Sequence, residues 1–149
     1  MSTYTETVGK KLNELLESTY DAERGFKKAA ENVDAGNLKG YFERKAQERY
    51  DFGHALKAEI RQFGQEVDKG DSIKGKAHRS WMDLKDLFSS DDEEAMLEEA
   101  QRGEESAVED YDDILSETNL PASTENLLKT QRNQIMEGLN KIKSLEDMA

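Results

Sequence analysis

The sequence predicts an all-α protein built as a four-helix bundle in up-down-down-up order. Apolar residues recur at steps of three and four along four long stretches, which is the period of an amphipathic helix that lies against a core. Pro121, Gly70 and the cluster Asp34 to Asn37 fall between these stretches. The connection between the second and third stretches is long enough to cross the bundle, so those two helices can run in the same direction. At 149 residues, the chain predicts one domain over residues 1–149.

The first helix is predicted over about residues 5–33 and the second over about 38–66. The first apolar stripe runs through Tyr4, Val8, Leu12, Leu15, Thr19, Ala22, Phe26, Ala29 and Val33. Asp34 to Asn37 interrupts the pattern and predicts a tight turn in which Asn37 caps the second helix. A loop containing Gly70 is expected to end that helix.

The third helix is predicted over about residues 92–117 and the fourth over about 125–148. Hydroxyl and acidic residues at 89–94 form a strong helix start, since they cap free N–H groups and suit the positive end of the helix dipole. Pro121 marks the turn into the fourth helix. Residues 73–88 carry apolar side chains at helical spacing, so we expect a short amphipathic helix in the crossover, anchored by Trp81.

Composition excludes several kinds of site. The chain has no Cys, so disulfides, thiolate chemistry and Cys-based zinc sites are absent. The net charge is −12, which argues against binding nucleic acid or anionic membranes, because both attract cationic proteins. No run of about 18 apolar residues occurs, and residues 1–6 lack the features of a signal peptide. We therefore expect a cytoplasmic protein without a membrane span.

Each predicted helix interrupts its apolar stripe with a polar residue at a similar level of the bundle. These residues are Glu23, Arg49, Glu104 and Gln131, with Gln134 on the flank of the last. Counting from the two short turns brings them within about one helical turn of each other, given the uncertainty of predicted helix ends. Ferritin-like bundles hold a di-metal centre at such inward polar positions, with a Glu on two helices and Glu-x-x-His on the other two.

The ligand set for such a centre is incomplete. The second helix offers Asp51-x-x-His54, but His54 is about 200° away from the stripe residues on either side of it. The fourth helix has no His. A guanidinium at the centre repels a metal ion and pairs with carboxylates. The sequence therefore favours a metal-free polar network of Glu23, Arg49, Glu104, Gln131 and Gln134.

Two alternatives stay open. The Arg49 side chain can instead extend along the groove to water, which would leave Glu23 and Glu104 hydrated. The second alternative is a bound pair of iron or manganese ions, with Glu23 and Glu104 as ligands and Glu48 or Glu137 recruited beside them.

Three segments resemble a bacterial family of ferritin-like four-helix-bundle proteins of unknown function. They are Glu23-Arg24-Gly25-Phe26 with Ala29-Ala30-Glu31, the run His78 to Lys85, and Arg102-Gly103-Glu104-Glu105 continuing to Tyr111. Arg49 and Gln131 also match that family, so the resemblance spans nearly the whole chain. It implies a ferritin-like bundle and no established reaction. The spacing from Glu104 to Tyr111 also resembles rubrerythrin-like proteins, more distantly.

Three functions follow as hypotheses. The favoured one is a non-enzymatic ferritin-like bundle without a cofactor, a stress-associated or interaction protein. The second is a di-iron or manganese oxidase or peroxide scavenger, with Tyr20 and Tyr111 near the glutamates. The third is a partner-binding or self-assembling module, in which four leucines widen the stripes into a dimer face: Leu16, Leu97, Leu115 and Leu139. No phosphate loop or nucleophile elbow supports hydrolase or transferase chemistry.

Overall fold

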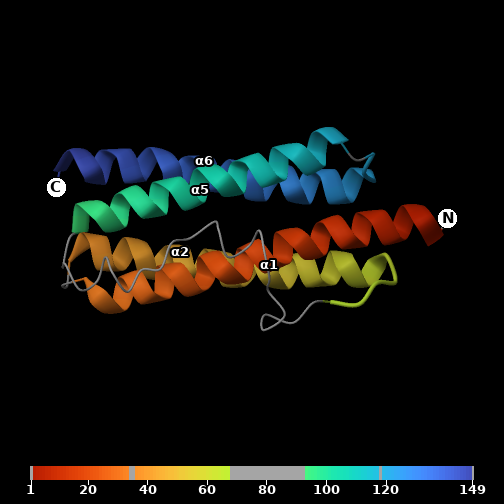
Figure 1. Cartoon of the computed structure of the whole chain (residues 1–149), viewed down its shortest axis with the longest axis horizontal. Helices are drawn as coiled ribbons and strands as arrows, with labels where there is room; N and C mark the ends of the chain where they lie inside the picture. The colour runs from red at the N-terminus through yellow and green to blue at the C-terminus, as the bar shows by residue number, and fades with distance from the viewer. Residues whose placement is uncertain (1, 34–35, 68–92, 118, 149) are drawn as a thin grey trace.

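The computed structural model describes residues 2–33, 36–67, 93–117 and 119–148. In these ranges the chain forms four long α-helices and no strand: α1 (Ser2–Asn32), α2 (Asn37–Gln62), α5 (Glu93–Glu117) and α6 (Ala122–Met148) (Figure 1). The prediction of an all-α protein with four long helices is confirmed. None of these helices has the length and apolar character needed to cross a membrane. The helix predicted over residues 73–88, with Trp81, lies outside the described residues.

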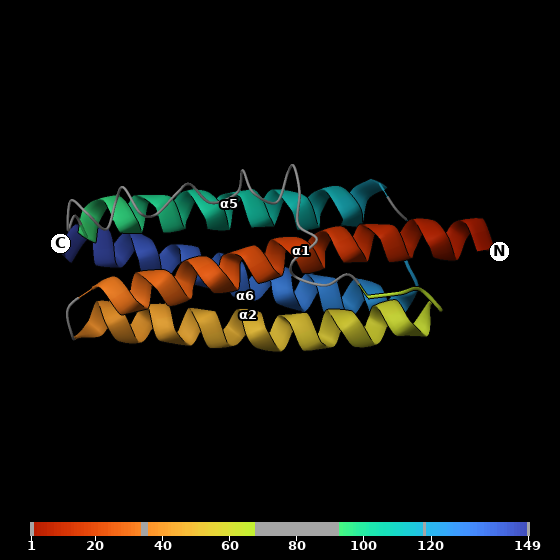
Figure 2. The ribbon, with the colours of Figure 1, turned by 60° about the horizontal axis from the view of Figure 1, so that its bottom comes forward.

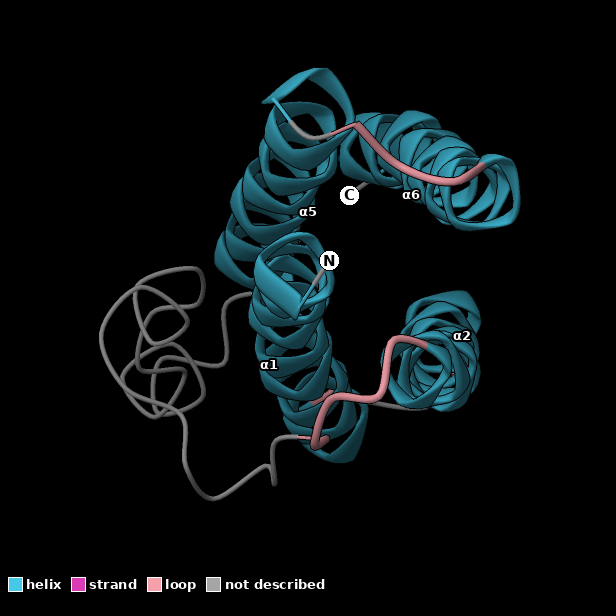
Figure 3. Ribbon diagram, turned by 90° about the vertical axis from the view of Figure 1, so that its right-hand side faces the viewer, coloured by secondary structure: helices cyan, strands magenta, loops and turns pink. Residues whose placement is uncertain are grey.

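The helices pack as two hairpins laid against each other. α1 packs along α2 and α5 along α6, whereas the α1–α5 and α2–α6 pairs make far less contact. Figure 2 shows the four helices side by side along the bundle. Viewed along the bundle, α2 and α6 stand well apart (Figure 3). The hydroxyl of Tyr4 donates a hydrogen bond to the carbonyl of Asn119, which ties the start of α1 to the turn between α5 and α6.

α2 ends four residues earlier than the sequence predicts, because Gly64 rather than Gly70 closes it. Gly64 adopts a φ of +72°, a conformation that glycine reaches without the steric cost of a side chain. Its N–H bonds the carbonyl of Arg61 at 2.9 Å, and the N–H of Gln65 bonds that of Ile60 at 3.2 Å. This pair of bonds is the Schellman motif, which satisfies the last carbonyls of a helix.

The starts of α2 and α6 also differ from the prediction. Gly36, with a φ of +130°, precedes α2 as its N-cap, and its carbonyl accepts the N–H of Gly40 at 3.2 Å. Asn37 is therefore the first residue of the helix rather than its cap. α6 begins about a turn before the predicted start, because the carbonyl of Pro121 already accepts the N–H of Glu125 at 2.9 Å. A proline fits there since its missing N–H is not needed at a helix start.

Among the described residues, the core consists of two apolar clusters, one toward each end of the bundle. One is built around Phe26 and Phe42, with ring centroids 6.2 Å apart. The other is built around Leu12, Leu56 and Ile135. Between the two clusters lies a level of buried polar side chains, which the next subsection describes: Lys45, Arg49, Glu104 and Gln131.

The four leucines expected to form a dimer face belong to the core instead. Leu16, Leu97 and Leu139 are 0, 1 and 6% exposed, and Leu115 is partly buried against the same apolar cluster as Leu16. A helix in a bundle touches two neighbours, so the face it buries is wider than one stripe. The leucines beside each stripe complete that wider face, and they do not form a surface patch.

Substitution by alanine should change stability in opposite directions at two glycines, Gly40 within α2 and Gly64 just after its end. Gly64→Ala forces a side chain into a positive φ and should lower the free energy of unfolding by about 1–2 kcal/mol. Gly40→Ala lies within the helix, where the new methyl group meets the flexible end of Arg44 at 3.3 Å, and should raise it by up to about 1 kcal/mol. Urea unfolding followed by circular dichroism measures both values. A Gly64→Ala variant as stable as the parent would contradict the proposed helix end.

Candidate functional site

Arg49 lies at the centre of the buried polar level. Its side chain is 2% exposed, its Nη2 atom donates to Oε1 of Glu104, and its Nη1 atom donates to Oε1 of Glu48 at 2.6 Å. The guanidinium carbon lies 5.5 Å from the ring centroids of both Phe26 and Phe52. Aromatic faces attract a cation, so the two rings and two carboxylates together replace part of the hydration that burial removes.

Lys45 supplies a second buried cation one helical turn before Arg49. Its Nζ atom lies 2.5 Å from Oε1 of Glu48 and 3.4 Å from Oε2 of Glu104. The Glu104 side chain is fully buried, whereas that of Glu48 is 23% exposed. We call these four residues the ionic layer: Lys45, Glu48, Arg49 and Glu104. Its two positive and two negative charges balance, which buried ions require because an unpaired charge in the interior is very costly.

α6 meets the ionic layer at Gly138. A Cβ atom at this position would lie 2.6 Å from Nζ of Lys45 and 3.4 Å from Oε2 of Glu104. The carbonyl of Gly138 accepts a hydrogen bond of 3.2 Å from the hydroxyl of Tyr41. A side chain on this face of α6 would thus push the ammonium group away from its carboxylates, so the glycine makes room for Lys45.

Gln131 is buried beside the ionic layer but bonds to other partners. Its Oε1 atom accepts a hydrogen bond of 2.6 Å from the hydroxyl of Tyr111, and its Nε2 atom donates to the carbonyl of Phe52 at 3.4 Å. Its amide therefore fixes the direction of the Tyr111 hydroxyl. In this way α2, α5 and α6 are linked at the same level as the ions.

The other residues predicted for the network lie away from it. Glu23 forms an ion pair of 2.9 Å with Lys27 one turn further along α1, and both line a surface groove between α1 and α2. Gln134 and Glu137 are exposed on a groove of about 610 Å³ between α2 and α6. The structure thus joins Arg49 with Glu104 and places Glu23 and Gln134 in two surface grooves, away from the ionic layer.

Sequence inspection missed Lys45 and did not place Glu48 in the network, although a signal for both exists. Tyr41, Lys45, Glu48 and Phe52 recur at steps of four, three and four, which marks a second inward stripe on α2 beside the one through Arg49. Two charges within that stripe are visible in the sequence. The stripe through Tyr41 and Phe52 is harder to recognise as inward-facing, because the neighbouring stripe of Phe42, Ala46 and Arg49 is more apolar.

The carboxylates considered as metal ligands do not converge. Glu48 and Glu104 meet at the ionic layer, whereas Glu23 and Glu137 lie in two different surface grooves. His54 is exposed, and its ring lies against that of Tyr50, with centroids 4.6 Å apart. Over the described ranges, no three His, Asp or Glu side chains are grouped so that they could hold a metal ion.

Two buried tyrosines flank the ionic layer and resist ionisation. Burial raises the pKa of Tyr111 well above its ordinary value of 10.0, and the positive charge of Arg49 and the nearby hydroxyl of Thr19 offset this only in part. Burial also raises the pKa of Tyr41, and the negative charge of Glu104 adds to the effect. Both hydroxyls therefore stay protonated in the folded protein and act as hydrogen-bond donors, to Gln131 and Gly138 respectively.

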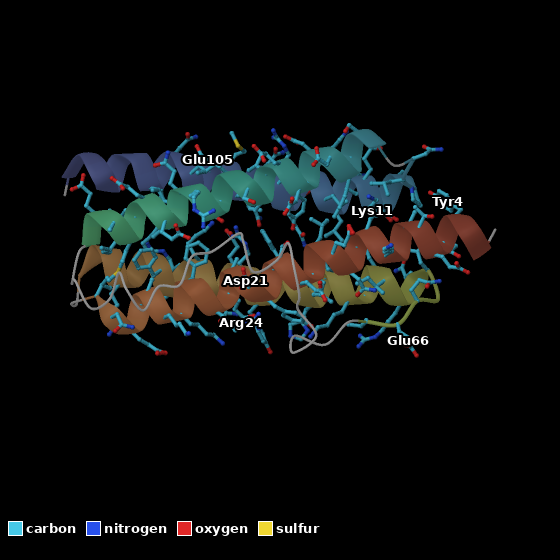
Figure 4. The ribbon with its side chains drawn as sticks, in the orientation of Figure 1. Tyr4, Lys11, Asp21, Arg24, Glu66 and Glu105 are labelled. Atoms are coloured by element: carbon cyan, nitrogen blue, oxygen red, sulfur yellow. The ribbon has the colours of Figure 1, made fainter. Side chains whose placement is uncertain are left out.

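Neutralising Glu104 should destabilise the bundle strongly. Glu104→Gln leaves Lys45 and Arg49 buried with a single counter-charge, and breaking a buried ion pair in this way costs about 3–5 kcal/mol. Glu105→Gln is the matched control, since Glu105 is the next residue of α5 and is exposed (Figure 4). We expect that change to stay within about 0.5 kcal/mol. Urea unfolding at neutral pH compares the two, and equal costs would show that the ionic layer is not stabilised by this pairing.

Alkaline titration should separate the buried tyrosines from the others. Because the pKa of each buried tyrosine is raised in the folded state, its protonated hydroxyl contributes fully to the stability of the fold below pH 10. This contribution is lost as the pH rises through the raised pKa. Of the five tyrosines, we expect two to ionise only as the protein unfolds, measured by absorbance at 295 nm with circular dichroism in parallel. Tyr41→Phe and Tyr111→Phe should each remove one of these late tyrosines. Ionisation of all five in the folded protein would contradict the assignment.

Comparison with known proteins identifies a family but no activity. No curated protein matches the chain in sequence. A family model described as a domain of unknown function, DUF2383, matches residues 7–117. This range contains all four members of the ionic layer, whereas Gln131 and Gly138 lie beyond it. Because the match covers most of the sequence, the chain belongs to the DUF2383 family.

Proposed function

We propose that this protein is a non-enzymatic ferritin-like bundle in which the ionic layer stands where metal-binding relatives of the fold hold two metal ions. The observation that carries the proposal is the burial of Lys45 and Arg49 against Glu48 and Glu104. In this view the ammonium and guanidinium groups supply the positive charge that the inward carboxylates require. No cofactor is needed to balance the site.

The directions of the helices support the ferritin-like assignment. In Figure 2, α2 and α5 both begin at the end of the bundle away from the N-terminus, and α1 and α6 begin at the other. These directions support the up-down-down-up order expected when a long crossover joins the second helix to the third. The buried carboxylate of Glu104 lies midway along α5, the level at which di-metal bundles place theirs.

Electrostatics argue against a metal at this level. Both carboxylates of the ionic layer already accept contacts from Lys45 and Arg49. A unit charge about 4 Å from another costs or gains about 4 kcal/mol near a protein surface, and a divalent ion beside two cations would meet several times that repulsion. The imidazole of His54 on α2 is exposed and lies against Tyr50 rather than at the ionic layer, so the donor set fits such a centre poorly.

The ionic layer would act as a specificity device for the bundle. Buried ion pairs add little net stability, because desolvation offsets their attraction, but they penalise every arrangement that separates the partners. Arg49 reaches from α2 to Glu104 on α5, and Lys45 reaches the same carboxylate. A shift of one turn between α2 and α5 would leave buried charges unpaired, so the layer selects a single register.

Metal analysis tests the proposal directly. The protein is purified from cells grown with added iron and manganese, and its metal content is measured by mass spectrometry beside its rate of ferrous iron oxidation. We expect far less than one metal ion per chain and no oxidation above that of buffer. Stoichiometric metal that is lost in Glu104→Gln would overturn the proposal in favour of a di-metal oxidase. If Glu104→Gln does not fold, Glu48→Gln serves, since its side chain is partly exposed.

A further inference from the structure

A small cavity lies between α1 and α5, directly beside the ionic layer. The polar groups on its wall include Thr19 of α1, Arg49 of α2 and Tyr111 of α5, and Ala22, Gly103 and Ala107 supply apolar surface. The cavity leaves about 10 Å³ for the centre of a water molecule, and a space of roughly 10–15 Å³ is what one buried water needs. Its size therefore admits a single water and nothing much larger.

Arg49 brings unused hydrogen-bond donors to this cavity. A guanidinium has five N–H groups. Two of those of Arg49 are used by Glu48 and Glu104, which leaves three N–H groups that can donate to a molecule in the cavity. The side chain is 2% exposed, so bulk water does not satisfy them. A buried donor without an acceptor costs about 1–3 kcal/mol, which favours a bound molecule that accepts a hydrogen bond.

The two hydroxyls on the wall complement these donors, because each already donates elsewhere. The hydroxyl of Thr19 donates to the carbonyl of Leu15 at 2.8 Å, and that of Tyr111 donates to Gln131 at 2.6 Å. Both oxygens keep lone pairs that can accept. Thr19 and Tyr111 are also near enough for the Thr19 hydroxyl to lower the pKa of Tyr111, so they border the same space.

We propose that this cavity is the binding site of one structural water molecule. The water accepts a hydrogen bond from Arg49 and donates to Oγ1 of Thr19 and to the hydroxyl oxygen of Tyr111. Three such bonds are usual for a buried water. A cation is disfavoured by the guanidinium, and an anion by Asp110 on the wall and Glu104 beyond Arg49. The water joins α1 to the polar level that α2, α5 and α6 already share.

A crystal structure of the full chain tests this site, with and without a bromide soak. We expect one density peak within hydrogen-bond distance of Arg49, Thr19 and Tyr111, and no anomalous signal there after the soak. An empty cavity, or one closed by an Arg49 side chain that donates to protein acceptors, would overturn the proposal. An anomalous bromide peak would also overturn it, because it would identify an anion site.

Two substitutions at Thr19 separate the water from packing. Thr19→Ser keeps the hydroxyl and should retain the density peak, whereas Thr19→Val keeps the shape but loses the acceptor and should lose the peak. We expect the unfolding equilibrium constant of Thr19→Val to rise about tenfold, the usual scale for a lost buried hydrogen bond. Thr130→Val, at an exposed position of α6, controls for the substitution itself. Retention of the peak in Thr19→Val would show that Thr19 does not hold the water.

Discussion

The interior of this bundle must balance its own charges. Lys45 and Arg49 are removed from water on α2, and a carboxylate lies against each of them. In a low-dielectric interior such groups tolerate neither a missing partner nor a large displacement. The positions of α2 and α5 along the bundle axis are therefore coupled through Glu104. The apolar clusters on either side can each be repacked in many ways, but they must fit around this fixed level.

The neighbours of the ionic layer follow from that constraint. Phe26 and Phe52 present their faces to the guanidinium, which explains large aromatic residues beside a charge in the core. Gly138 leaves space for the ammonium group on the α6 side. Tyr41 and Tyr111 remain protonated donors on either side of it. The match to the DUF2383 family covers the four charges but ends before α6, so the space for Lys45 is provided by a helix outside the matched region.

Much of the fold could be predicted from the sequence, because long helices with apolar stripes are the strongest local signal. The predicted helix ends were less accurate. Gly64 ends α2 and Pro121 starts α6 through backbone hydrogen bonds, which the pattern of apolar residues does not reveal. For the site, Arg49 and Glu104 stood on the stripes, and the structure brings them together. Glu23 also stood near a stripe, yet one residue is a rotation of about 100° on a helix. That rotation sends Glu23 toward Lys27 at the surface. Lys45 was missed because a charge on the flank of a stripe resembles an ordinary surface residue.

The ionic layer is unevenly divided between the two hairpins. The α1–α2 hairpin brings Lys45, Arg49 and Glu48, while the α5–α6 hairpin brings Glu104. At this level the first half of the molecule carries one excess positive charge and the second half one excess negative charge. Two copies of the same hairpin would therefore bury like charges face to face, and two different hairpins would not. This charge distribution favours pairing of an α1–α2 hairpin with an α5–α6 hairpin over pairing of two identical hairpins. The two different hairpins can come from separated halves of one chain or be exchanged between two chains.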